Sequence, residues 1–286
     1  MTLTTTSAAT LSLLLAAILT GCSTGGGSAN SGLDGNSAAD GTGSNSTTDT
    51  DNSEQGEAGT PGVLHDAYLW FDGNVTAVLD GNDVVIEATG RPDHTSPYWN
   101  PNNASGLYVA PDPSITTVSA MSPGYIEQYN NLYTLRVPTS PSRSAFMTST
   151  SLGPIGIAVS GAPIFNDQEG PNVDLELGVI SGFDRSGGHT GPENYHYHLE
   201  PRAISFDDDA LIGVIADGFL IYGRKCYSTP GAYPDDLDYS GGHVSLTQHS
   251  NGAEEYHYHV KNELYLGSYY LLFPEDFQGT PSTISR

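Results

Sequence analysis

The strongest constraint on this chain is a pair of matching segments in its second half. Residues 156–166 have a counterpart in residues 213–223, displaced by 57 positions (213 − 156 = 57). Each segment is followed by Asp-x-Ser-Gly-Gly-His, at 184–189 and 238–243, and then by Tyr-His-Tyr-His, at 195–198 and 256–259. Unrelated segments would not share ordered motifs of this length, so we predict tandem repeats at about 153–200 and 211–260 that form a pseudo-twofold core.

Each repeat places three histidines where they can converge. Residues two apart on a β-strand point to the same face, so His196 and His198 are expected to project together, with Cα atoms about 6.6 Å apart. The Gly-Gly pair before His189 suits a tight turn that folds this histidine back over the strand. Imidazoles bind metal at about 2.0 Å, and the preceding loop is expected to supply a third ligand, His189 or Asp184, or a carboxylate that orients the ligands. The predicted ligands and ligand-orienting carboxylates are Asp184, His189, His196, His198, Asp238, His243, His257 and His259.

The ligand types narrow the choice of metal. Three imidazoles with an open position favour copper or zinc, whereas calcium prefers oxygen ligands. The acidic runs at 207–209 and 235–236 lack a spaced calcium loop with a closing Glu, so they are predicted to be solvated loops. An open metal position can support hydrolysis or oxidation, but the sequence shows no separate general base or substrate pocket. Whether the protein is an enzyme therefore stays open.

Two metal-free interpretations also stay open. Buried neutral imidazoles can bridge carbonyls and hydroxyls, so the histidines could simply hold the loops together. Alternatively, the protein is a metal-free surface adhesion or polysaccharide-binding module, in which aromatic rings stack on sugars. The aromatic candidates for that role are Tyr98, Trp99, Tyr125, Tyr129 and Tyr133. The tyrosines of the two Tyr-His-Tyr-His motifs are instead predicted to pack in the core, because alternate aromatics suit a half-buried strand.

The first 60 residues are predicted to lie outside the fold. An apolar run at 11–18, too short to span a membrane, leads into Leu19-Thr20-Gly21-Cys22, so residues 1–22 are expected to be a lipoprotein signal peptide. Cleavage would leave Cys22 as the lipidated membrane anchor. Ser23 after it favours the outer membrane, with the protein facing the periplasm or the exterior of the cell envelope. Residues 23–60, rich in Gly, Ser, Asn and Asp, are predicted to be a disordered tether.

The rest of the chain, 61–286, is predicted to form one mainly β domain, a β-sandwich or barrel-like fold with few short helices. Short β-branched runs separated by Asp-Gly turns between 64 and 86 are typical of a β-meander. Further strands are expected at 132–137 and 155–159. No stretch combines a long helical period with caps at both ends.

Charge and cysteine content limit the partners. The chain has 33 Asp+Glu and 9 Lys+Arg, a formal net charge of −24, so the phosphates of a nucleic acid would be repelled. No nucleic-acid partner is expected, and a protein or carbohydrate partner is not identified. Because Cys22 belongs to the export signal, Cys226 is predicted to be a lone thiol.

The Gly-Gly-His and Tyr-His-Tyr-His motifs, with the segment at 217–223, resemble the bacterial YHYH protein family over about residues 90–275. This resemblance implies an exported protein but names no substrate. Many members have Cys where this chain has Ser186 and Ser240, and Pro where it has Leu220, so no cysteine role is carried over to those positions. The expected function is therefore that of an exported, lipid-anchored protein that binds copper or zinc through duplicated histidine motifs.

Overall fold

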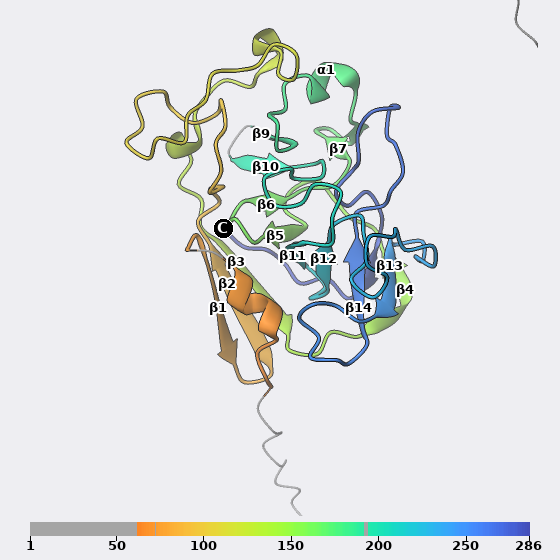
Figure 1. The fold of residues 1–286 in the computed structure, drawn as a ribbon. Helices are drawn as coiled ribbons and strands as arrows, with labels where there is room; N and C mark the ends of the chain where they lie inside the picture. The colour runs from red at the N-terminus through yellow and green to blue at the C-terminus, as the bar shows by residue number, and fades with distance from the viewer. Residues whose placement is uncertain (1–61, 72, 192–193) are drawn as a thin grey trace, which may run out of the picture. The chain divides into compact units, whose positions relative to one another are not determined.

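A computed structural model describes residues 62–286, except 72 and 192–193. The predicted signal peptide with Cys22 and the predicted tether lie outside the described residues. The described part is mainly β, as predicted, with one eight-stranded sheet, one three-stranded sheet and two two-stranded sheets (Figure 1). Its helices are short, and none in this part has the length and apolar character to cross a bilayer. They are η1 (Asp66–Trp70), η2 (Val118–Ala120), η3 (Ile126–Gln128) and α1 (Leu177–Ile180).

The three-stranded sheet contains two strands of the predicted meander and takes its third strand from later in the chain. It consists of β1 (Val75–Asp80), β2 (Asp83–Ala88) and β3 (Tyr133–Pro138), paired in that order and antiparallel. The β1–β2 turn uses Gly81 at φ 66°, a left-handed conformation that glycine adopts at little cost. The segment 66–70 is not the extended run that we expected. It forms η1, because the His65 ring accepts a hydrogen bond from the Ala67 backbone N–H and caps the helix.

The large sheet has the order β13-β14-β12-β11-β5-β6-β10-β9. The antiparallel β11–β5 pair lies at its centre, and the order is the same when read outward on either side. Each half contains two antiparallel hairpins joined by a parallel pair, β6–β10 or β12–β14. This is the symmetry that a tandem duplication would produce, although the duplication itself remains a prediction. The strands are β5 (Gly156–Ala158), β6 (Pro163–Ile164), β9 (Gly188–Thr190), β10 (Tyr195–Tyr197), β11 (Leu211–Ile215), β12 (Leu220–Tyr222), β13 (Gly242–Ser245) and β14 (Glu255–His259).

The two small sheets complete the strand inventory of the described residues. One pairs β4 (Arg143–Thr148) with β15 (Phe277–Gly279). The other pairs β7 (Gln168–Glu169) with β8 (Val173–Asp174). The β7–β8 pair is not part of the eight-stranded sheet, although Figure 1 shows it close to β10. This small hairpin matters below because it carries Glu169.

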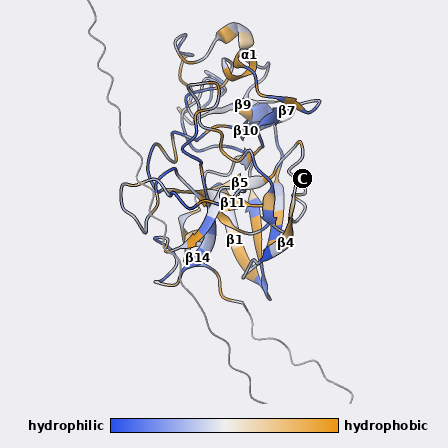
Figure 2. Cartoon of the chain, turned by 90° about the vertical axis from the view of Figure 1, so that its right-hand side faces the viewer, coloured by the Kyte–Doolittle hydropathy of each residue, from blue (hydrophilic) through white to orange (hydrophobic). Residues whose placement is uncertain are grey.

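The main core joins residues of the three-stranded and the eight-stranded sheets. Ile86 and Leu135 from the former lie in one buried cluster with Ile157 and Val214 from the latter. The motif tyrosines Tyr195, Tyr197 and Tyr258 belong to the same cluster, which confirms that they pack in the core. A smaller cluster of Leu175, Ile180, Phe183 and Leu199 includes a residue of α1, the orange helix of Figure 2.

Close backbone approach at the centre of the large sheet requires glycine. A Cβ atom at Gly213 would lie 2.3 Å from the Ile157 carbonyl oxygen of the adjacent strand, which is backbone and cannot turn aside. We expect Gly213→Ala to lower the free energy of unfolding by about 2–3 kcal/mol, measured by urea denaturation. Gly178→Ala is the control: its Cβ would meet nothing within 4 Å in α1, so stability should be unchanged or rise slightly. Equal losses in both variants would contradict the steric argument.

Candidate metal centres

The first centre comprises Glu169, His189, His196 and His198. His189 on β9 is the antiparallel partner of His196 on β10, and His198 follows two residues later on the same face. Glu169 comes from β7. One ligand atom from each of the four residues lies within 4.8 Å of all the others. The Nε2 atoms of His189 and His196 are 3.1 Å apart, and Glu169 Oε1 is 2.8 Å from His189 Nε2.

The second centre comprises Cys226, His243, His257 and His259. His243 on β13 is the partner of His257 on β14, which repeats the arrangement of the first centre. The four ligand atoms again lie within 4.8 Å of one another, and all four residues are buried. The Nε2 atoms of His257 and His259 are 3.1 Å apart, and Cys226 Sγ is 3.6 Å from His243 Nε2. Around a tetrahedral zinc ion these separations would be about 3.3 and 3.6 Å.

The hydrogen bonds of the Nδ1 atoms determine which ring nitrogen is available to a metal. In five of the six histidines, Nδ1 faces an oxygen of a backbone carbonyl or carboxylate. These oxygens can only accept, so Nδ1 carries the proton and Nε2 presents a lone pair to the centre. The five contacts are His196 to Asn194 O (3.3 Å), His198 to Asn166 O (2.6 Å), His243 to Asp236 Oδ1 (2.6 Å), His257 to Glu255 O (3.0 Å) and His259 to Gly223 O (2.7 Å).

Lone pairs therefore face one another inside the first centre. His198 Nε2 and Glu169 Oε1 are 3.3 Å apart, and the His198 Nε2 atom, whose ring carries its proton on Nδ1, is buried without a hydrogen-bond partner among the described residues. Burial lowers the pKa of His196 well below its usual value and also lowers the pKa of His189, which disfavours imidazolium. Burial tends to raise the pKa of Glu169, but its contacts with the histidines outweigh burial and lower it, so it is a carboxylate at neutral pH. A bound cation would satisfy all four atoms.

Two ligands of the second centre are also in their metal-binding protonation state. Burial, together with the nearby His259, lowers the pKa of His257 to about 3. Burial alone would raise the pKa of the Cys226 thiol, but the proximity of His259, Ser228 and Ser245 lowers it to about 5. At neutral pH the centre therefore offers the Cys226 thiolate and the neutral His257 imidazole, which are the forms that bind transition metals.

The two predicted aspartates lie outside both groups of ligand atoms. Asp184 accepts hydrogen bonds from the Tyr195 and Ser96 hydroxyls and from backbone N–H groups of its own turn. Asp238 accepts from the Tyr256 hydroxyl and from the Gly242 N–H. We predicted that these aspartates bind the metal or accept hydrogen bonds from the histidines. The structure corrects this prediction, because the turn directs each carboxylate to the face of the strand that carries the tyrosines. The carboxylate beside His243 is that of Asp236.

This correction predicts separable effects on stability and metal content. Asp184→Ala leaves several buried donors without an acceptor, so we expect the free energy of unfolding to fall by about 2–3 kcal/mol. Asp238→Ala, at a half-buried position, should cost less. Folded samples of both variants should hold as much metal as the unsubstituted chain, measured by elemental mass spectrometry. Loss of one ion per chain in either variant would restore the aspartate to the ligand set.

Sequence reasoning missed Glu169 and Cys226, which supply the fourth position of each centre. Cys226 is a free, buried thiol, as the sequence predicted, and its sulfur lies among the histidines of the second centre. The signal was present, because these two residues are related by the same displacement as the flanking segments (226 − 169 = 57). Their different chemistry concealed the correspondence. Asn166 and Gly223, whose carbonyls bond His198 and His259, are related by the same displacement (223 − 166 = 57).

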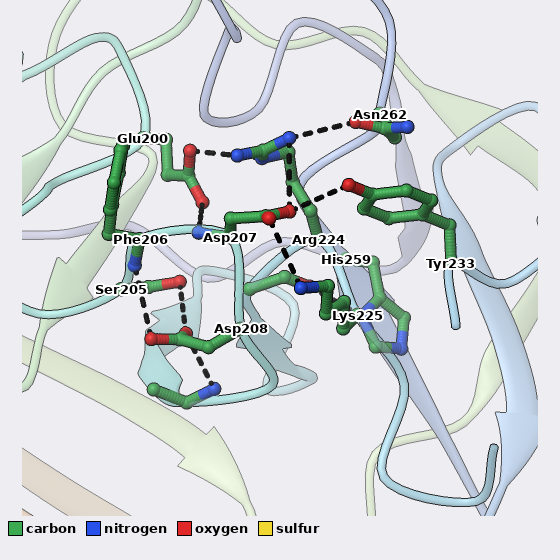
Figure 3. Close-up of polar contacts among 12 residues, drawn as sticks. Glu200, Ser205, Phe206, Asp207, Asp208, Arg224, Lys225, Tyr233, His259 and Asn262 are labelled. Carbon is green, nitrogen blue, oxygen red and sulfur yellow. Dashed lines mark hydrogen bonds and ion pairs between the residues drawn. The ribbon is translucent and has the colours of Figure 1, made fainter. Parts of the chain in front are cut away.

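A buried ion-pair network supports the segment that carries Cys226 (Figure 3). The Arg224 guanidinium donates to Glu200 Oε2 at 3.0 Å and to Asn262 Oδ1 at 2.9 Å, and it lies 3.8 Å from the centre of the Tyr270 ring. Asp207 contacts both Arg224 and Lys225. The acidic run at 207–209 is thus not a simple solvated loop, since Asp207 joins this network. Figure 3 places His259 beside it.

The aromatic platform expected for a sugar-binding module does not form. Tyr98, Trp99 and Tyr133 are buried in the main core. Tyr125 is exposed and Tyr129 is half-buried, so two of the five candidates reach solvent. Stacking on a polysaccharide needs exposed ring faces, and this observation weakens the metal-free alternative.

Comparison with models of known protein families gives a match. Residues 134–235 match the family described as YHYH protein. The matched segment contains the whole first centre and Cys226, whereas the three histidines of the second centre lie beyond it. No curated protein matches the chain, and neither does any solved structure. The chain therefore carries a YHYH domain, which confirms the resemblance found in its motifs.

Proposed function

We propose that this protein is an exported, lipid-anchored metal-binding protein whose YHYH domain and following hairpin hold two transition-metal ions, one in each centre. The observation that carries the proposal is the convergence of four ligand atoms at each of two buried points, with His198 Nε2 lacking a hydrogen-bond partner among the described residues. Buried polar groups ordinarily have partners, because leaving one unsatisfied costs about 1–3 kcal/mol. Bound cations would supply those partners.

The donor sets support zinc or copper. Imidazole and thiolate nitrogen and sulfur atoms suit borderline-soft ions, whereas magnesium and calcium prefer oxygen. Zinc fits both centres, since four ligands drawn from imidazole, thiolate and carboxylate are its usual coordination. Copper(I) fits the second centre, where the thiolate lies. The choice between copper and zinc is settled by measuring the metal that the protein retains when purified.

The decisive experiment is elemental mass spectrometry on the untagged full chain. Two copper or zinc ions per chain are expected, and His196→Gln and His257→Gln should each lose one. His65→Gln is the matched control, because this histidine lies outside both centres and should leave the metal content unchanged. A chain that contains no metal and takes up none on titration would leave the histidines a purely structural role.

The export and anchoring part of the proposal rests on the signal sequence that ends at Cys22. Lipidation would place the domain on a membrane of the cell envelope, in our proposal the outer membrane, with residues 23–60 as its tether. Cys22→Ser is expected to abolish incorporation of labelled palmitate and to release the protein from the membrane fraction. Cys226→Ser should keep the label, because Cys226 is buried. Unchanged labelling of the Cys22 variant would refute the anchor.

A further inference from the structure

We infer that the two centres have different roles: the second centre is closed and keeps its ion as part of the fold, whereas the first is open to chemistry, because Glu169 can give way to a small external ligand. The inference rests on the proposed function, since it requires an ion in each centre. It assigns the first centre a ligand class, namely small anions or neutral donors that coordinate through oxygen or nitrogen.

Solvent access distinguishes the two centres. Of the eight ligand residues, seven are buried and only Glu169 is half-exposed. Its side chain is 26% exposed, whereas Cys226 is 1% exposed. Because Glu169 Oε1 is itself buried, a small molecule from solvent reaches the first centre once the half-exposed Glu169 side chain moves aside, whereas the second centre has no half-exposed ligand that could do the same.

The segment that carries Glu169 is also held less firmly than the segment that carries Cys226. Glu169 lies on the two-residue strand β7, which pairs only with β8 and is hydrophilic, as its blue colour in Figure 2 shows. Gly170, next in the chain, has open space around it. Cys226 instead has its backbone N–H bonded to Ala232 O and its Sγ beside Ser228 and Ser245. Few packing contacts allow a segment to open locally, so moving Glu169 costs less than moving Cys226.

Displacing Glu169 would leave a known type of reactive centre. Its histidines lie on β9 (His189), on β10 (His196) and directly after β10 (His198), and they would hold the ion without the carboxylate. Three imidazoles with one exchangeable position form the ligand set of catalytic zinc sites, whereas structural zinc sites are closed by four protein ligands. One chain thus combines both kinds of ligand set.

Cobalt(II) substitution with azide as the small ligand tests this division of roles. In the full chain loaded with two cobalt ions, azide is expected to change the visible d–d bands and to leave the thiolate-to-cobalt charge-transfer band of the Cys226 centre unchanged. Glu169→Gln should bind azide about tenfold more tightly, because the competing carboxylate is removed. Cys226→Ser should lose the charge-transfer band and keep the azide response.

Each other outcome has a defined meaning. A change in the charge-transfer band on adding azide would overturn the inference, because the closed centre would then be the reactive one. Absence of a response in the unsubstituted chain, even if Glu169→Gln responds, would also overturn it by showing that Glu169 is not displaced. A chain that binds no cobalt, zinc or copper would instead overturn the proposed function itself.

Discussion

Chelation of the bound metal is expected to lower the thermal unfolding midpoint of the protein by at least about 10 °C. A ligand present at 1,000 times its Kd stabilises the folded state by about 4.1 kcal/mol, provided that it binds only that state. For a domain of 150–250 residues, 1 kcal/mol corresponds to about 2–4 °C in the midpoint. A single tightly held ion therefore accounts for about 8–16 °C, and two ions for more.

The location of the centres explains why the metal should act on the fold as a whole. β9 and β13 are the two edge strands of the large sheet, and each carries one histidine that faces a ligand on the adjacent strand. A bound ion ties these edges to β7 or to the segment that contains Cys226. Without it, the buried lone pairs of His257 and His259, whose Nε2 atoms are 3.1 Å apart, face each other without compensation.

The measurement is a pair of melting curves, with and without excess chelator, on a sample of known metal content. The control is the double variant His196→Gln/His257→Gln, which should melt at a lower temperature and should no longer respond to chelator. If a chain shown to contain two ions melts at the same temperature after both are removed, the centres do not stabilise the fold. The ions would then serve only chemistry or transport.

Local sequence rules predicted the histidine geometry well. Alternation along a strand placed His196 and His198 on one face and their tyrosines on the other, and the structure has this arrangement. The Gly-Gly turn likewise brings His189 beside His196, with Gly187 at φ 75°. These features depend only on neighbouring residues and on the pleat of a strand.

Features that depend on distant parts of the chain were not predictable in the same way. Glu169 follows β6 and Cys226 follows β12. They join their centres because β6 pairs in parallel with β10, and β12 with β14, which brings the segments after β6 and β12 beside the histidines. Asp184 was assigned to the metal from its position near His189, but strand pairing aims it at Tyr195. Segment 66–70 had the composition of a strand, yet a cap from His65 turned it into a helix.

Replacement of Arg224 is expected to be among the most damaging single changes outside the ligands. The Arg224–Glu200 pair is buried, with side chains 6% and 5% exposed, and burial raises the pKa of Glu200 although Arg224 counters it. Arg224→Met would leave the carboxylate buried without its cation, which typically costs about 3–5 kcal/mol. We expect the free energy of unfolding to fall by about that amount, measured by urea denaturation.

Replacement of Arg224 should disturb the ligand positions of the second centre more than those of the first. Arg224 lies between Gly223, whose carbonyl orients His259, and the segment that leads to Cys226. Loss of its contacts with Glu200 and Asn262 loosens the backbone that positions both, whereas Glu169 and its histidines lie on other strands. In the cobalt-loaded Arg224→Met variant, the charge-transfer band of the thiolate should therefore weaken while the azide response persists.

Two further variants separate the ion pair from a general loss of packing. Arg224→Met/Glu200→Gln removes the uncompensated charge and should recover a large part of the lost stability, because replacing both members of a buried pair costs less than removing one. Lys225→Met is the matched control, since its partner Asp207 is 37% exposed and pairs of that kind contribute about 0–1 kcal/mol. If Lys225→Met proves as costly as Arg224→Met, the buried pair is not what holds the Cys226 segment, and the support of the second centre must come from its backbone hydrogen bonds instead.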